Sequence, residues 1–213
     1  MKLTGLLRVA VVALMAVAML PSSARSQDRA SNDAGDVQFE LIGQVTNATP
    51  TTSIQYGYLT FINGISGVTD IFNPGPQNES TARFTFFNDT ANERVINNGT
   101  IRIINRVGTT TIYLNPLGNA TFAIPATFQN GIVVQTSVLR HQVVIDTVTG
   151  AFTTTFVNTI TSADRFQLGE SSFILGKAGQ TFRTTVSGHL NTPGALPSAY
   201  IAGYAAGPDI VRP

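Results

Sequence analysis

The stretch "VLRHQVVIDTVTGAFTTTFV" (residues 138–157) decides the fold class of this chain. It joins two segments, 132–146 and 151–161, that are rich in Val, Ile, Thr and Phe, the residues enriched in β-strands. Between them the turn "TVTG" ends on Gly150, a residue that adopts left-handed backbone geometry without steric penalty. The stretch therefore predicts two long antiparallel strands joined by a tight turn.

Similar strand signals follow one another along the rest of the chain, separated by turn residues. After the first 26 residues, no segment of useful length shows the 3.6-residue period of an amphipathic helix. We therefore expect about eight or nine strands and almost no helix. The further predicted strands are 37–45, 54–62, 80–87, 94–106, 109–114, a short pair or bulged strand over 166–176, and 180–190, with turns at Asn98-Gly99 and Val107-Gly108 and long connections at 63–78 and 117–131.

Several predicted strands are apolar on both faces, notably 54–62, 101–104 and 132–145. An antiparallel sheet with one face in water would alternate more cleanly between apolar and polar residues. We therefore predict an all-β fold, a single closed antiparallel β-barrel of about eight strands over 37–191, whose outside is also covered. A two-sheet β-sandwich or jelly roll is the alternative. The C-terminal segment or another subunit would supply the cover, which leaves a homo-oligomer open.

The first 26 residues have the pattern of a secretory signal peptide. Lys2 and Arg8 precede an apolar stretch that Pro21 ends, and this stretch of about 12 residues is shorter than the ~20 of a membrane helix. The sequence predicts a secreted or periplasmic protein without a membrane span in its mature form. Residues 27–36 are expected to form a flexible arm and residues 192–213 an irregular tail, with a short helix around 198–206 as the alternative.

Composition excludes several classes of function. The chain has no Cys, which rules out disulfides, thiolate metal sites and thiol catalysis. Its net charge is +1 with 12% charged residues, so no basic patch is available for nucleic acid. The two histidines, His141 and His189, lack metal-binding spacing, and no phosphate loop or dinucleotide glycine motif occurs. We therefore predict no metal and no cofactor.

Strand phase assigns candidate site residues, because alternate residues share a face. Arg140 and His141 lie on opposite faces of 132–146, and His141 shares its face with Leu139, Val143 and Ile145, which favours an inward position. Arg183 lies in the predicted strand 180–190. If this strand and 132–146 are neighbours, Arg140 and Arg183 line one cavity mouth and hold the polar end of a ligand. Solvent-facing positions on the barrel exterior are the alternative for both arginines.

Four further residues are candidates for chemistry inside the barrel. If its face is interior, Glu40 is a partly buried carboxylate and a candidate general acid or base, as His141 is separately. Tyr56, Tyr58 and Tyr113 would then donate phenol hydrogen bonds to a ligand oxygen. A rim or surface position is the alternative for all four residues.

Two short motifs carry a resemblance to a known group of proteins. These are "Gly-Tyr-Leu" at 57–59 in an early strand and the glycine-punctuated "LGKAGQTFRTTVSG" at 175–188 before the last predicted strand. With the length of the chain and its many strands, they resemble the small calycin-type barrels of the allene oxide cyclase and dirigent group over 37–190. The resemblance implies a barrel with an apolar interior, oligomers, and sometimes cofactor-free ring closure or stereochemical steering.

These observations predict an exported barrel that binds a small, largely apolar molecule, with Arg and Tyr side chains orienting its polar end. Two alternatives from other classes are retained. One is a cofactor-free isomerase or cyclase of the allene oxide cyclase type that uses the same pocket. The other is a structural or adhesive surface module with a filled core.

Overall fold

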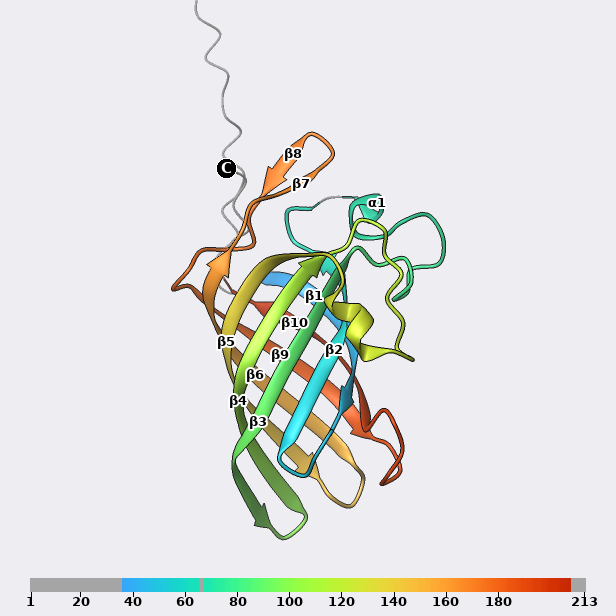
Figure 1. Ribbon diagram of the computed structural model, residues 1–213. Coiled ribbons are helices and arrows are strands. Elements are labelled where there is room, and N and C mark those ends of the chain that lie inside the picture. The colour runs from blue at the N-terminus through green and yellow to red at the C-terminus, as the bar shows by residue number, and fades with distance from the viewer. Residues whose placement is uncertain (1–35, 66, 208–213) are drawn as a thin grey trace, which may run out of the picture. The chain divides into compact units, whose positions relative to one another are not determined.

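The computed structural model describes residues 36–65 and 67–207, and Figure 1 shows their arrangement. The predicted signal peptide (1–26), most of the predicted arm (27–36) and residues 208–213 of the predicted tail lie outside the described residues. Among the described residues, no helix is long and apolar enough to cross a membrane.

Eight antiparallel strands close into a barrel, as predicted. Each barrel strand pairs with the next barrel strand along the chain, and the last pairs with the first. This closure removes every open sheet edge from the ring. The sandwich alternative is therefore wrong. The barrel strands are β1 (Val37–Thr46), β2 (Thr52–Ile62), β3 (Phe84–Asn98), β4 (Ile101–Leu114), β5 (Ile132–Asp146), β6 (Ala151–Ala163), β9 (Thr181–Leu190) and β10 (Ala199–Ala206).

One end of the barrel is filled by segments between the strands. The hairpin of β7 (Phe166–Leu168) and β8 (Ser171–Phe173) and the short helix α1 (Val68–Ile71) lie at this end, which is uppermost in Figure 1. Phe166 and Leu175 belong to the same hydrophobic core as the inward side chains of the strands, and the Phe166 ring lies edge-on to Phe84 of β3. This end is therefore packed with side chains.

Gly108 lies inside a continuous strand, β4, and does not end one. The predicted turn at Val107-Gly108, and with it the division into 94–106 and 109–114, is therefore wrong. Gly108 pairs with Thr90 of β3, and a Cβ at this position would collide with the carbonyl oxygen of Asp89. The glycine marks a close approach of two backbones, which a sequence pattern does not distinguish from a turn.

The tail contains the strand that closes the barrel, which corrects two predictions. Residues 192–213 were expected to be irregular, or helical around 198–206, but β10 pairs with both β9 and β1. Its residues alternate, with Ala199, Ile201 and Ala205 buried and Tyr200 and Tyr204 exposed. The small inward residues hide the alternation, because they do not read as a hydrophobic face. The barrel thus extends past residue 191 to Ala206.

The outer cover of β2 comes from the connection between β4 and β5, and not from the C-terminal segment, which was the predicted source within the chain. This connection, 115–131, contains the 3₁₀ helix η1 (Pro125–Gln129), which lies beside β2 in Figure 1. Its Phe128 packs against Tyr56 on the outside of β2, with ring centroids 5.3 Å apart. This contact explains why 54–62 is apolar on both faces.

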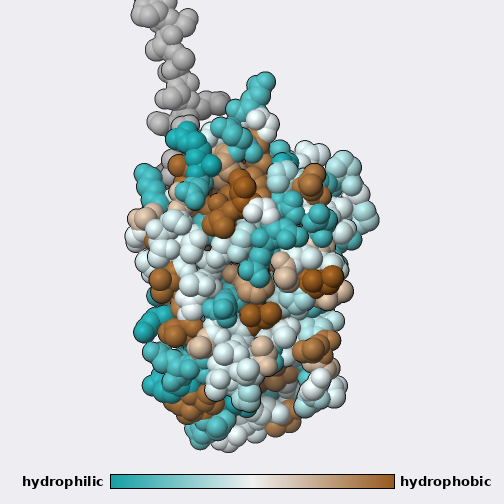
Figure 2. Space-filling model, in the orientation of Figure 1, coloured by the Kyte–Doolittle hydropathy of each residue, from teal (hydrophilic) through white to brown (hydrophobic). Residues whose placement is uncertain are grey.

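Other parts of the outer wall face solvent. Arg140 and Gln142 on β5 and Thr153 and Thr155 on β6 are exposed. Figure 2 shows hydrophilic and hydrophobic residues interspersed over the middle of the visible wall.

Candidate functional site: a cavity in the open end of the barrel

A cavity of about 280 Å³ lies in the barrel end opposite α1 and the β7–β8 hairpin. Each of the eight barrel strands contributes at least one side chain to its lining, and the turn between β1 and β2 adds Asn47 and Pro50. The walls are largely aliphatic and aromatic. They include Ile104, Val143, Ile145, Phe152, Val186 and Ile201.

The cavity ends inside the barrel. Deeper in the interior, a void of about 20 Å³ remains between side chains that include Phe86, Phe182 and Asn158. Polar groups at this level bond to one another: the Thr110 hydroxyl donates to Asn158 Oδ1 at 2.7 Å, and both side chains are buried. The cavity therefore opens at one end of the barrel and is blind at the other.

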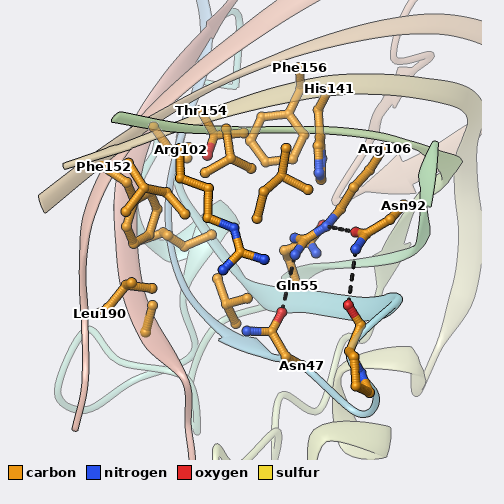
Figure 3. Close-up of a pocket in the computed structure, with 18 of the residues that line it drawn as sticks. Asn47, Gln55, Asn92, Arg102, Arg106, His141, Phe152, Thr154, Phe156 and Leu190 are labelled. Carbon is orange, nitrogen blue, oxygen red and sulfur yellow. Dashed lines mark hydrogen bonds between the residues drawn. The ribbon is translucent and has the colours of Figure 1, made fainter. Parts of the chain in front are cut away.

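Arg106 is the buried cation of the cavity. It lies on the inward face of β4 and is only 8% exposed. Its Nε donates to Asn92 Oδ1 at 2.8 Å and its Nη2 to Asn47 Oδ1 at 3.3 Å, as Figure 3 shows. Both acceptors are neutral amides. Across the described residues no carboxylate forms an ion pair with Arg106.

The cavity carries a positive charge that no described ion pair balances. Burial lowers the pKa of the Arg106 guanidinium to about 10, and the charge of Arg102 adds to this effect, so Arg106 stays charged at neutral pH. Arg102, exposed at the mouth, points into the same space in Figure 3. No Asp or Glu is among the described lining residues. Low-dielectric walls strengthen the resulting positive field.

His141 lies opposite Arg106 in the pairing of β4 and β5 and is 5% exposed. Its predicted inward position is confirmed. The ring stands edge-on to Phe156, with centroids 4.9 Å apart. Both ring nitrogens are buried and have no hydrogen-bond partner in the described structure.

Burial, and to a smaller extent the charge of Arg106, lowers the pKa of His141 to about 3. The imidazole is therefore neutral at physiological pH and presents one donor and one acceptor. Gln55 adds a further polar atom: its Nε2 donates to Ser53 Oγ at 2.8 Å and Thr90 Oγ1 at 3.3 Å, while its buried Oε1 has no partner among the described residues. The ring nitrogens of His141 and Gln55 Oε1 are therefore available to a molecule bound in the cavity.

Glu40 lies on the outside of the barrel, exposed to solvent. Its neighbours Phe39 and Leu41 are buried in the core, and alternation along β1 turns the carboxylate between them outward. The prediction of Glu40 as a partly buried acid or base inside the barrel is therefore wrong.

Arg140 and Arg183 share a face, as predicted, but it is the outer face. Both pair with Val157 of β6, from β5 and β9, and both are exposed. Arg140 Nη2 lies 3.5 Å from Glu93 Oε1 on this surface. The prediction that they line the cavity mouth is wrong, because His141 takes the inward phase of β5 and Phe182 that of β9.

The three tyrosines also lie outside the barrel. Tyr56 is buried beneath 115–131, and its hydroxyl is 3.3 Å from Gln44 Oε1 and 3.1 Å from Thr46 Oγ1. Tyr58 packs against Phe72, and burial, followed by the charge of Glu79, raises its pKa. Tyr113 is half-buried on the outer face of β4. None of the three lines the cavity, which corrects their predicted role as ligand donors.

Sequence reasoning missed the groups that make the cavity polar, namely Arg102, Arg106, Asn92, Asn47 and Gln55. A signal was present in "IRIINR" (101–106), where Arg102 and Arg106 share the phase of Ile104. The buried Thr110 and Ile112 continue the same face of β4. The wrongly predicted turn at Val107-Gly108 separated them from it, so the inward face was not recognised as continuous.

The fold and the site define an eight-stranded antiparallel barrel with a blind, largely apolar, positively charged cavity. Comparisons with protein-family models, curated proteins and solved structures find no match. The resemblance to allene oxide cyclase and dirigent barrels therefore stays a prediction from sequence. Within the described residues, no group of three or more His, Cys, Asp or Glu side chains is arranged to hold a metal ion.

Proposed function

We propose that the protein binds a small, largely apolar molecule in the open end of its barrel. The observation that carries the proposal is the cavity itself, about 280 Å³ of space lined by side chains from all eight strands, most of them aliphatic or aromatic. Small-molecule sites are concave, mostly apolar and begin at roughly 300 Å³. An eight-stranded barrel is wide enough to hold one small ligand.

The contrast between the two ends of the barrel supports a ligand over a purely structural role. One end is filled by Phe166 and Leu175, whereas the other leaves Val143, Ile145 and Phe152 around an open cavity. Apolar side chains around an open cavity lack the burial and dispersion contacts that a bound apolar molecule would give them. The cavity therefore favours a ligand site over a structural or adhesive module, for which a filled core is expected.

The site favours binding over the isomerase or cyclase alternative. A general acid or base works best when its pKa lies near the working pH, and the pKa of His141 is about 3. Glu40 lies on the far side of the wall, so it does not assist His141. We further propose, on the predicted signal peptide, that binding takes place outside the cytoplasm.

Two neighbouring valines of β5 provide a matched test. Val143 lines the cavity, whereas Val144 faces outward with 37% of its surface exposed. With the neutral probe N-phenyl-1-naphthylamine, we expect wild type and Val144→Phe to enhance its fluorescence with similar affinity. We expect Val143→Phe, which places a ring in the cavity, to weaken binding at least about tenfold. Equal affinity of the two variants would contradict the proposal.

A further inference from the structure

We infer that the ligand is a carboxylate, an organic monoanion with an apolar body, and that Arg106 and His141 bind its charged end. This inference rests on the proposed function and specifies its ligand. It is carried by two independent features of the same cavity. One is a buried guanidinium without a counter-ion, and the other is a buried imidazole without a hydrogen-bond partner.

The guanidinium is the first feature. An arginine carries five N–H donors, and the hydrogen bonds to Asn92 and Asn47 use two of the five on Arg106. A buried charge is unfavourable unless it is paired, and the described ion pair of this chain, Arg140 with Glu93, lies on the outer surface. No described residue of the chain supplies an anion for the remaining donors of Arg106.

The two amides also hold the guanidinium in place. Asn92 comes from β3 and Asn47 from the turn between β1 and β2, so Arg106 is held from two separate elements. A fixed planar guanidinium is well suited to a carboxylate, which accepts two parallel N–H bonds from it. The anion expected here is thus planar and bidentate.

The imidazole is the second feature. His141 lies beside Arg106 on the neighbouring strand, and both its nitrogens are buried and unpartnered within the described structure. A neutral imidazole donates one hydrogen bond, which a carboxylate oxygen accepts. His141 therefore supplies a donor next to the cation, and Phe156 holds its ring edge-on.

The rest of the cavity limits the ligand further. Arg102 at the mouth adds a second positive charge, and no described lining residue is acidic, so a cationic ligand is disfavoured. Beyond the charged groups the walls are Val143, Ile145, Phe152 and Val186, which suit an apolar body. A single carboxylate on a compact hydrocarbon or aromatic body matches both parts of the site.

Calorimetric titration with three compounds of one shape tests the inference at pH 7.5. The compounds are 2-naphthoate, 2-naphthalenemethanol and 2-naphthylmethylamine, which carry a negative, a neutral and a positive group. We expect wild type to bind the carboxylate at least about tenfold more tightly than the alcohol, and the amine most weakly. Added salt should weaken binding of the carboxylate and leave that of the alcohol unchanged.

Two arginine variants distinguish the effect of the buried charge in the cavity from the effect of the net charge of the protein. We expect Arg106→Met to lose the preference, so that it binds the carboxylate and the alcohol with similar affinity. Arg140→Met removes the same charge from the outer wall and should keep the wild-type preference. If Arg106→Met does not fold, the ratio of affinities and its salt dependence in wild type decide the question.

The outcomes distinguish the inference from the proposed function beneath it. Equal affinities for carboxylate and alcohol in wild type, or a preference that survives Arg106→Met, would overturn the carboxylate assignment and leave the apolar cavity as a binding site. Failure of all three compounds to bind would overturn both.

Discussion

Arg106 on β4 and His141 on β5 oppose each other in the register of the barrel, and both line its cavity. One is a charged group without a described counter-ion, and the other a neutral group without a described hydrogen-bond partner. Two such groups side by side are unfavourable for folding alone, because buried polar groups need partners. A bound carboxylate, as proposed, would supply partners for both groups.

The first prediction concerns the pH dependence of stability. Burial lowers the pKa of His141 from 6.5 to about 3 in the folded protein, so the unfolded chain binds the proton first as pH falls. The stability associated with the neutral form is complete above pH 6.5 and is lost as pH falls toward 3. Between pH 6.5 and 5 we expect wild type to lose about 2 kcal/mol more than His141→Leu in urea unfolding.

The other histidine provides the control for this experiment. His189 is exposed, so His189→Gln should keep the pH dependence of wild type. A His141→Leu protein whose stability falls with pH as steeply as that of wild type would show that the imidazole is not buried and neutral.

The second prediction concerns the stability of the unliganded protein without its buried charge. Arg106→Met removes a guanidinium that no described carboxylate balances, while the aliphatic part of the side chain is largely kept. We expect the free energy of unfolding to stay the same or rise by about 1 kcal/mol, since buried charges are often replaced by apolar groups without loss. Loss of more than about 2 kcal/mol would indicate that the chain itself compensates the charge.

The third prediction concerns closure of the barrel by β10. A Cβ at Gly203 would collide with the carbonyl oxygen of Thr185 on β9, whereas Ala202 next to it faces outward. We expect Gly203→Val to lower the free energy of unfolding by about 2 to 3 kcal/mol, the range of overpacked interiors, and Ala202→Val to change it little. Similar unfolding midpoints in urea for the two variants would contradict the placement of β10 between β9 and β1.

The fourth prediction concerns residues that sequence reasoning placed in the site and the structure places outside. Glu40→Gln and Arg183→Gln alter exposed groups of the outer wall. Each should bind N-phenyl-1-naphthylamine within about twofold of wild type, because neither group reaches the cavity. A tenfold loss of affinity in either variant would return that residue to the site.

The sequence predicts the fold well where side chains alternate strongly. In β5 the run from His141 to Ile145 separates inward from outward residues, and this phase was read correctly. The two-residue period fails where the interior is polar or small. Asn88 and Thr90 point inward in β3, and the small Ala199 and Ala205 point inward in β10, so the inward face of each stretch is only weakly hydrophobic.

The cavity was predictable in kind but not in its residues. A largely apolar barrel interior with an arginine in its lining follows from the composition and the strand pattern. Which arginine faces inward depends on the register across several strands, which long-range pairing determines. Gly108 illustrates this, because its close contact with Asp89 is a property of two strands and not of one.

The most direct test of the central claim is to locate a bound probe by methyl NMR. On addition of N-phenyl-1-naphthylamine, we expect saturable shifts of the methyl signals of Val143, Ile145 and Ile201, which line the cavity. The exposed methyls of Val138 and Val144 on the outer face of the same strand should not move. Shifts confined to the outer methyls, or no saturable shift of the cavity methyls, would contradict the account.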